Sequence, residues 1–431
     1  MERKYLTKLI QWKEKNNRKP LIIKGARQVG KTWLMKEFAQ KEFDKWVYIN
    51  FEDNELAKHV FEKDFDIQRI ILQLSIATQT TIDKETLIIF DELQEAPRGV
   101  TALKYFQEKA PEYYIIAAGS LLGITLHQGT SFPVGKVDFL ELYPLSFIEF
   151  LLANGERLLA NLIEEQQWDT LAPFHDKLCE LLKTYYFVGG MPEVVKTFVD
   201  EKDILQVREI QKSILNAYDN DFSKHAPTSE VPRIRMVWKS IMAQLAKENK
   251  KYIFGLLKEG ARAREFELAI EWLVDAGLVY KIQKTKKGLL PLSAYEDFSS
   301  FKLYLLDIGL LGAMSNVPAK VLLSGNSIFT DYKGAMTEQY VLQQIKTKLS
   351  SIYYWAAENS SGEIDFLMQN EENIVPLEVK AEENLQAKSL KSFIAKNPHL
   401  HGLRTSMSPY REQDWLTNVP LYGIGCCWSK C

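Results

Sequence analysis

Residues 21–32 read LIIKGARQVGKT, and this stretch decides the fold of the N-terminal part of the chain. The apolar run LII predicts a buried strand, and the segment WLMKEFAQKEF after Thr32 has the apolar spacing of a helix. Between them lies Gly25-x-x-x-x-Gly30-Lys31-Thr32, a glycine-rich loop that leads into a helix N-terminus. Such a loop wraps its N–H groups around phosphate oxygens, because glycine places no Cβ in the way. The sequence therefore predicts a site for nucleotide phosphates.

Each part of the predicted loop has an expected role. The Lys31 ammonium would reach the β- and γ-phosphates, and the Thr32 hydroxyl would ligate Mg²⁺. The chain lacks an Asn-Lys-x-Asp sequence, which reads guanine, so ATP is the expected nucleotide. The residues expected to contact it are Gly25, Ala26, Arg27, Gln28, Val29, Gly30, Lys31, Thr32 and Trp33.

A second apolar strand ends in two acids. Residues 86–92 read TLIIFDE, which predicts a buried parallel strand that ends in Asp91 and Glu92. Asp91 would hold Mg²⁺ directly or through water, and Glu92 would orient and deprotonate an attacking water. A third strand, YYIIAAGS, ends in Ser120, which is placed to sense the γ-phosphate or that water. Strands that alternate with helices predict a doubly wound parallel α/β sheet, with ligands at the strand C-terminal ends.

Composition bounds the class of protein. The chain has 431 residues, of which 46% are hydrophobic and 26% charged, as expected for a soluble globular protein of several domains. The net charge of −2 means that any nucleic-acid surface must be local. No signal peptide and no apolar stretch long enough for a membrane helix is present, so a cytoplasmic location without membrane contact is expected. Four cysteines do not form a disulfide framework and are expected to be free thiols: Cys179, Cys426, Cys427 and Cys431.

Several of these segments together resemble a known family. GARQVGKT, LIIFDE, AAGS and ELYPLSFIEF are similar to an AAA+-type P-loop ATPase of the AAA_14 group. The later stretches YFVGGMPEVV, LYLLDIGLLGAM and GAMTEQYV resemble the DUF4143 region usually fused behind it. The resemblance implies ATP and Mg²⁺ as cofactors and a homo-oligomer such as a hexamer; it names no protein partner. It also assigns the Walker A, Walker B and sensor roles to Lys31, Thr32, Asp91, Glu92 and Ser120.

The resemblance raises the question of a residue that acts on a neighbouring subunit's nucleotide. Relatives tend to carry Gly-Arg where this chain has Gly135-Lys136. Lys136 would then be a catalytic residue in trans, although a lysine offers a point charge without the guanidinium fork. A solvated loop lysine is the alternative, and Arg98 is a second candidate for the same role.

The middle of the chain predicts two further domains behind an ATPase core at 1–145. A helical lid is expected at 146–230. Two helices and a hairpin with a basic turn then predict a winged helix at 231–300. Its lysines and arginines suggest phosphate contact with DNA, and the alternative is a wing that only contacts protein. These basic residues are Lys247, Lys250, Lys251, Lys258, Arg262, Arg264, Lys281, Lys284, Lys286 and Lys287.

The C-terminal part, 301–431, resembles a PD-(D/E)xK nuclease core, that is, a restriction-endonuclease-like α/β domain. A predicted helix with Glu338 precedes strands that carry Asp365 and then Glu378-x-Lys380. Asp365 and Glu378 would share Mg²⁺, Lys380 would orient the attacking water, and Glu338 can reach in from the helix. The alternatives are a hairpin with a charged outer face and a degenerate nuclease fold that only binds.

The leading hypothesis is an ATP-binding and ATP-hydrolysing protein whose nucleotide state controls a winged-helix and nuclease-like C-terminal half. One alternative is a metal-dependent DNA nuclease regulated by the ATPase. The other is a nucleotide-latched binding protein with a degenerate nuclease fold.

Overall fold

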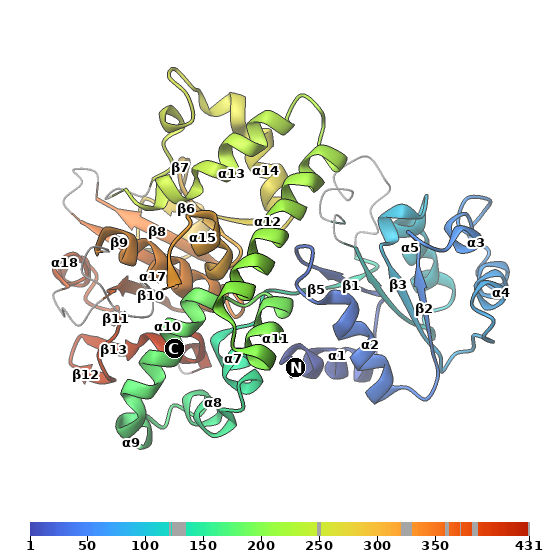
Figure 1. The fold of residues 1–431 in the computed structure, drawn as a ribbon, viewed down its shortest axis with the longest axis horizontal. Helices are drawn as coiled ribbons and strands as arrows, with labels where there is room; N and C mark the ends of the chain where they lie inside the picture. Colours follow the sequence, from blue (N-terminus) through green and yellow to red (C-terminus); the bar gives the residue numbers. More distant parts are fainter. Residues whose placement is uncertain are drawn as a thin grey trace. The chain divides into compact units, whose positions relative to one another are not determined.

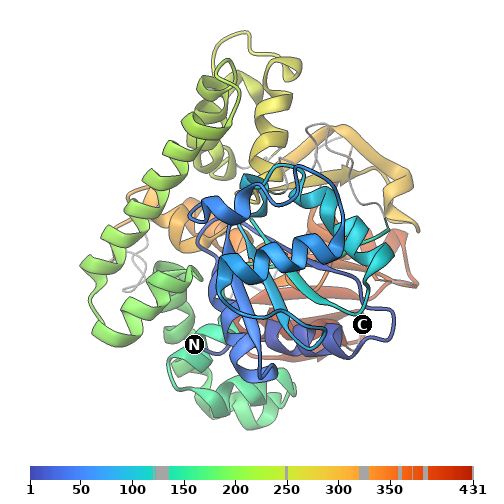
Figure 2. The ribbon, with the colours of Figure 1, turned by 90° about the vertical axis from the view of Figure 1, so that its right-hand side faces the viewer.

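Two β-sheets organise the chain, and each belongs to its own unit (Figure 1; Figure 2). The P-loop unit holds residues 2–143 and 275–277; the C-terminal unit holds residue 1, 144–274 and 278–431. The computed structural model describes residues 1–119, 122, 135–247, 251–319, 330–357, 362–370, 372–381 and 387–429.

The P-loop unit is built on a five-stranded sheet in the order β2-β3-β4-β1-β5. All of its pairings are parallel, which confirms the predicted parallel α/β sheet. Strand β4 separates β1 from β3, so its C-terminal end lies between the glycine-rich loop and the two acids. The strands are β1 (Leu21–Lys24), β2 (Trp46–Asn50), β3 (Leu87–Asp91), β4 (Tyr114–Ala118) and β5 (Asp138–Glu141).

Helices cover both faces of this sheet. On one face Trp12 meets Phe38 edge-on at 6.4 Å between ring centroids. On the other, Phe90 of β3 packs in a core with Phe61 and Phe106. The first face carries α1 (Tyr5–Glu14) and α2 (Lys31–Glu42), and the second carries α4 (Ile67–Thr78) and α5 (Gly99–Lys109); α3 (Glu55–Lys58) and the 3₁₀ turn η1 (Leu93–Glu95) complete the unit.

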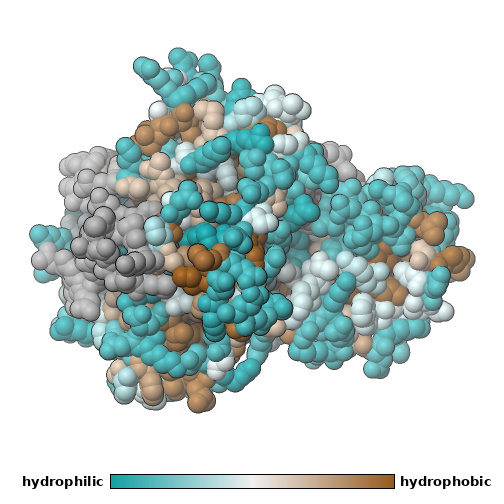
Figure 3. Space-filling view, in the orientation of Figure 1, coloured by the Kyte–Doolittle hydropathy of each residue, from teal (hydrophilic) through white to brown (hydrophobic). Residues whose placement is uncertain are grey.

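The outer helices of this unit leave apolar side chains in solvent, and Figure 3 shows brown surface at the outer edge over α3 and α4. Leu56 is 78% exposed, Leu72 62% and Ile76 66%. Leu72 and Ile76 are four residues apart on α4 and therefore share one face of the helix.

The C-terminal unit contains an eight-stranded mixed sheet in the order β12-β13-β11-β10-β9-β8-β6-β7. Strand β6 lies in the predicted wing, but its hairpin partner is β7, after the segment 289–295 that was expected to be the second strand and that contains the 3₁₀ helix η4. The β6–β7 hairpin joins this sheet because β6 pairs with β8 at Lys284 and Tyr354. The boundary expected at residue 300 therefore lies inside β7. The strands are β6 (Val279–Thr285), β7 (Glu296–Leu305), β8 (Ile352–Ala356), β9 (Glu363–Gln369), β10 (Ile374–Val379), β11 (Gly402–Ser406), β12 (Arg411–Gln413) and β13 (Leu416–Pro420).

Helices surround this second sheet. Helix α18 packs Leu390, Phe393 and Ile394 on an apolar cluster that includes Leu367 of β9. Phe366, the residue before Leu367 in β9, contacts the ring of Tyr304, near α17. The helices of residues 147–225 belong to the same unit as this sheet. They are α7 (Phe147–Ala153), α8 (Arg157–Glu164), α9 (Trp168–Leu171), α10 (His175–Val188), α11 (Pro192–Glu201) and α12 (Ile204–His225), followed by α13 (Val231–Leu245), α14 (Ala263–Asp275), α15 (Ile308–Met314), α17 (Thr330–Lys346) and α18 (Lys388–Lys396); the 3₁₀ helices are η2 (Ala172–Phe174), η3 (Phe254–Leu256), η4 (Leu292–Tyr295) and η6 (Leu421–Ser429).

Asp307 joins three segments of the C-terminal unit. Its Oδ2 accepts hydrogen bonds from the Gly190 N–H at 2.6 Å and from Gln343 Nε2 at 2.9 Å. Its Oδ1 accepts from the Leu310 N–H at 3.0 Å and so caps α15. A Cβ on Gly189 would lie 2.2 Å from Oδ1, so this position needs glycine. The stretches GGMP and LLDIG, which mark the family resemblance, therefore meet at a buried structural contact.

Two further expectations concern composition. In the parts of the chain that the structure describes, no helix combines the length and apolarity needed to cross a bilayer. Among the residues that the structure describes, Cys179, Cys426 and Cys427 form no disulfide. Cys431 lies outside the described residues.

Candidate functional site

The loop before α2 has the backbone conformation of a phosphate cradle. Gln28 has φ 67° and Gly30 has φ 92°, both in the left-handed region, and Gly30 is the N-cap of α2. Gly25 has φ 147°, and a Cβ there would lie 2.4 Å from the carbonyl oxygen of Leu142. Gly25 therefore cannot be replaced by a larger residue without moving the backbone beside it.

Lys31 lies inside this loop. Its side chain is buried, and Nζ donates to the carbonyl oxygens of Gly25 and Ala26, both at 2.8 Å. Burial lowers the pKa of Lys31 to about 8, although the charges of Glu92 and Asp91 oppose the change. The ammonium is thus held by neutral acceptors that an anion can replace.

The first β3 acid meets the loop directly. Thr32 Oγ1 donates to Asp91 Oδ2 at 2.6 Å, although the two residues are 59 positions apart. The Tyr48 hydroxyl donates to the same oxygen at 2.9 Å, and the Glu92 N–H donates to Oδ1 at 3.1 Å. Burial and the Asp91 charge raise the pKa of Tyr48, so this hydroxyl stays a donor. Asp91 is therefore fixed from three sides.

Tyr48 was not predicted as a site residue. Its position on β2, the strand next to β3, places its hydroxyl at Asp91. Strand order was needed to assign this contact, because Tyr48 and Asp91 are 43 positions apart in the sequence. The Lys36 ammonium lies 3.8 Å from the centre of the Tyr48 ring and holds it from the α2 side.

The second acid, Glu92, sits at a strained position. Its backbone is left-handed, with φ 50° and ψ 44°, and Glu92 is the N-cap of the short turn η1. Its Oε2 accepts a hydrogen bond from Gln94 Nε2 at 2.5 Å. Gln94 is the second residue of this site that sequence reasoning missed.

The remaining predicted residues lie as follows. Ser120 is outside the described residues. Lys136 pairs with Glu108 at 3.1 Å. Arg98 donates to the Glu62 carbonyl at 2.6 Å, and its guanidinium lies 4.2 Å from the centre of the Phe65 ring. Lys136 and Arg98, the two candidates to act on a neighbouring subunit's nucleotide, therefore both contact residues of their own P-loop unit. Of the loop residues, Arg27 is exposed, as is Trp33.

Each predicted nuclease residue contacts a neighbour within the C-terminal unit. Glu338 Oε2 accepts from the Tyr304 hydroxyl at 3.2 Å. Asp365 Oδ2 accepts from the Val379 N–H at 2.7 Å. Glu378 Oε1 pairs with Lys380 Nζ at 2.6 Å, while its Oε2 is buried without a hydrogen-bond partner in the described parts of the chain.

A lysine that was not predicted lies among these acids. Lys302 of β7 is fully buried, forms an ion pair with Glu363, and lies 4.0 Å from Glu338 Oε2. Burial disfavours its charge, but Glu363, Glu338 and Asp365 outweigh burial and raise the pKa of Lys302. Within the described ranges, no three His, Cys, Asp or Glu side chains are arranged to hold a metal ion. The cation in this cluster is therefore a lysine.

The basic residues of the predicted winged helix are partly neutralised. Lys258 pairs with Glu265 at 2.9 Å, and Lys281 pairs with Glu271 at 2.5 Å. Lys250 lies outside the described residues.

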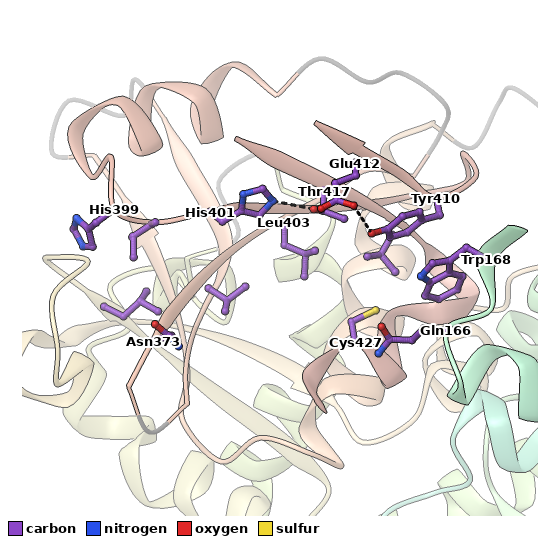
Figure 4. Close-up of a pocket in the computed structure, with 14 residues that line it drawn as sticks. Gln166, Trp168, Asn373, His399, His401, Leu403, Tyr410, Glu412, Thr417 and Cys427 are labelled. Atoms are coloured by element: carbon purple, nitrogen blue, oxygen red, sulfur yellow. Dashed lines mark hydrogen bonds between the residues drawn. The ribbon is translucent and has the colours of Figure 1, made fainter. Parts of the chain in front are cut away.

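A pocket of about 480 Å³ opens elsewhere in the C-terminal unit (Figure 4). Trp168 and Tyr410 stack at one end, with ring centroids 5.3 Å apart. His401 Nε2 and Thr417 Oγ1 lie 2.8 Å apart, and the Tyr410 hydroxyl donates to Glu412 at 3.4 Å. None of the predicted site residues lines this pocket.

Comparison with known families finds one match near the N-terminus of the chain and others in its middle and C-terminal parts. The AAA_14 family, described as an AAA domain, matches residues 17–151. DUF4143 matches residues 333–423. The chain joins an AAA-type P-loop ATPase domain to a DUF4143 domain. A further domain of unknown function, DUF8612, matches residues 179–321. The stretches YFVGGMPEVV and LYLLDIGLLGAM, which were expected to belong to DUF4143, lie within this match, and only GAMTEQYV lies within the DUF4143 match.

Two solved structures are similar to parts of the chain. The Walker-type ATPase PABY2304 of Pyrococcus abyssi is 13% identical, with 73% of this chain and 95% of that chain covered and a TM-score of 0.46. The Orc1 protein of Aeropyrum pernix in complex with DNA is 12% identical, with 74% and 93% covered and a TM-score of 0.29. No curated protein matches the chain.

Proposed function

We propose that this protein binds and hydrolyses ATP at the P-loop site, and that its nucleotide state controls the C-terminal unit. The observation that carries the proposal is the 2.6 Å hydrogen bond from Thr32 Oγ1 to Asp91 Oδ2. It joins the glycine-rich loop to the end of β3, across a sheet in which β4 separates the two strands. A hydroxyl and a carboxylate that meet beside a phosphate cradle form the donor set of a magnesium–nucleotide site.

The residues present fit ATP with Mg²⁺. Lys31 Nζ would exchange the carbonyls of Gly25 and Ala26 for phosphate oxygens, while loop residues from Gly25 to Trp33 surround the nucleotide. Thr32 and Asp91 offer the oxygen donors that Mg²⁺ prefers, and Tyr48 orients Asp91. Thr32 and Asp91 would hold Mg²⁺, which when bound would neutralise negative charge on the phosphates.

Hydrolysis is assigned to Glu92. Its carboxylate would take the proton of the attacking water, and the Gln94 amide holds one of its oxygens in place. Ser120 would sense the γ-phosphate, because it follows β4, the strand between the loop and the acids. Lys136 or Arg98 would act on a neighbouring subunit only after leaving its present partner.

The test is steady-state ATP hydrolysis by the full chain with Mg²⁺. Glu92→Gln should bind ATP but lower kcat by about 10²–10⁴-fold, since it removes the base. Lys31→Ala should lose ATP binding. Lys41→Met is the matched control, because Lys41 lies at the exposed end of the same helix and pairs with Glu37, away from the loop. ATP turnover by Glu92→Gln at the wild-type rate would refute the assignment.

Control of the C-terminal unit is tested separately by hydrogen exchange. Wild-type protein with ATP and with ADP should differ in protection within residues 144–429, and Lys31→Ala should show no such difference. If binding changes protection but no ATP is turned over, the protein is a nucleotide latch.

A metal-dependent DNA nuclease is the second candidate. The buried, unpartnered Glu378 Oε2 favours it, because such an oxygen lacks a donor or cation. The roles would be those of a PD-(D/E)xK site, with Glu338, Asp365, Glu378 and Lys380. The buried Lys302 weighs against it, because its ammonium already lies beside Glu338. DNA cleavage with Mn²⁺ that is lost in Asp365→Ala would support it.

Self-association and DNA binding complete the proposal. The exposed Leu72 and Ile76 on α4 support a homo-oligomer, since exposed apolar patches often mark interfaces. Light scattering of Leu72→Glu should then give a smaller species than wild type. DNA contact through the basic helix–hairpin region should appear as salt-dependent anisotropy of a labelled duplex.

A further inference from the structure

We infer that Gln94 is a further catalytic residue, which holds Glu92 in place and accepts a hydrogen bond from the attacking water. This inference rests on the proposed ATP hydrolysis. Gln94 lies two residues after Glu92, on the turn η1.

The amide nitrogen of Gln94 faces Glu92. Nε2 lies 2.5 Å from Glu92 Oε2. A carboxylate only accepts hydrogen bonds, so the NH₂ group must point toward it and the carbonyl oxygen away. The hydrogen bond to Glu92 uses the Gln94 amide nitrogen and leaves Gln94 Oε1 as an acceptor in need of a hydrogen-bond donor.

That carbonyl oxygen is buried and has no hydrogen-bond partner among the residues that the structure describes. An unsatisfied buried acceptor costs about 1–3 kcal/mol, so a donor is expected to reach it in the working state. It lies against Gly119, the residue directly after β4, where an added Cβ would be 1.9 Å from Oε1. The oxygen therefore sits at the strand end between the phosphate loop and Asp91.

This arrangement suits a water molecule, which has two protons to donate. Glu92 would accept one proton, and Gln94 Oε1 would accept a hydrogen bond from the other, which leaves an oxygen lone pair for the γ-phosphorus. The new bond forms between the water oxygen and that phosphorus, and the bond from phosphorus to the bridging oxygen breaks. The proton goes to Glu92, the products are ADP and phosphate, and the Gln94 amide stays neutral.

A purely structural role for Gln94, as a brace for the turn, predicts different behaviour. Three variants of the full chain separate the two roles. Gln94→Leu removes donor and acceptor, Gln94→Glu keeps an acceptor but loses the donor, and Gly119→Ala displaces the amide with a single methyl group. Gln107→Leu is the matched control, because Gln107 also has a buried, unpartnered carbonyl but lies on α5.

We expect Gln94→Leu to lower kcat for ATP by about 10²-fold, with KM and ATP affinity little changed. Gly119→Ala should lower kcat in the same way, and the double variant Gln94→Leu/Gly119→Ala should lose no more, because both changes remove one interaction. Gln94→Glu should move the acidic limb of its kcat–pH profile to higher pH, since two adjacent carboxylates resist being charged together. A brace for the turn alone would lower the stability of Gln94→Leu and Gly119→Ala and leave their kcat near the wild-type value. Gln107→Leu should behave as wild type.

Wild-type or increased kcat in Gln94→Leu overturns the inference, while a wild-type protein without ATPase activity overturns the proposed function instead. If Gln94→Leu does not fold, Gly119→Ala and Gln94→Glu decide, and wild-type kcat in both overturns the inference equally.

Discussion

Replacing Lys302 by methionine should destabilise the C-terminal unit strongly. Lys302 is fully buried, pairs with Glu363 and lies 4.0 Å from Glu338. Methionine has a similar length but no charge, so the carboxylates lose their cation. Removal of one partner of a buried ion pair costs about 3–5 kcal/mol, which should lower the melting temperature of this unit by about 10 °C.

The assay is urea and thermal unfolding of the full chain, with ATP binding measured in parallel as a check on the P-loop unit. Lys281→Met is the matched control on the adjacent strand β6, because its pair with Glu271 is partly exposed and worth at most about 1 kcal/mol. The pKa of Lys302 is raised above its unfolded value, so its contribution is fully present below about pH 10 and lost only as the pH rises further. The loss of unfolding free energy in Lys302→Met should therefore be equal at neutral pH and at pH 9.

A loss in Lys302→Met no larger than in Lys281→Met would refute this account of the cluster. Recovery of stability on adding Mn²⁺ to Lys302→Met would instead show that the same carboxylates accept a metal once the lysine is absent.

Three further predictions follow from single contacts. Asp307→Ala removes the shared acceptor of Gly190 and α15, and should cost about 2–4 kcal/mol in urea unfolding; a loss below about 1 kcal/mol would contradict the structural role of this motif. Tyr48→Phe removes a donor to Asp91 and should raise the Mg²⁺ concentration for half-maximal ATPase activity by about tenfold. An unchanged Mg²⁺ requirement would contradict the role of Tyr48 in orienting Asp91. In EDTA, ATP affinity by calorimetry should fall about tenfold from pH 7 to pH 9, since burial lowers the pKa of Lys31 to about 8 and the neutral amine binds phosphate poorly; constant affinity would exclude this titration.

The P-loop unit was largely predictable because its evidence is local. The spacing of Gly25, Gly30, Lys31 and Thr32 specifies a loop within eight residues, and the apolar runs that become β1, β3 and β4 need no partner to be recognised. The contact of Thr32 with Asp91 also follows, because the loop after β1 and the end of β3 lie at the same edge of a parallel sheet.

The C-terminal unit was less predictable because its evidence is long-range. Local pattern predicted a hairpin within 278–295, but only its first strand, β6, lies there, because Leu292–Tyr295 form η4 and the partner strand β7 starts at Glu296. Only the pairing of Lys284 with Tyr354 places β6 in a larger sheet, and the sequence of a strand does not indicate which strands it pairs with. Lys302 lies in a strand whose sequence, FKLYL, gives no sign of the acids around it.

The sequence by itself determined the phosphate loop, the acidic strand end and the parallel sheet, because glycine spacing and apolar periodicity act between near neighbours. Only the tertiary structure decided that Tyr48 steadies Asp91, that Gln94 holds Glu92 beside Gly119, and that Lys302 is the cation among the C-terminal acids. Each of these contacts depends on strand order, register or the path of a turn, and those are fixed by packing across the whole unit.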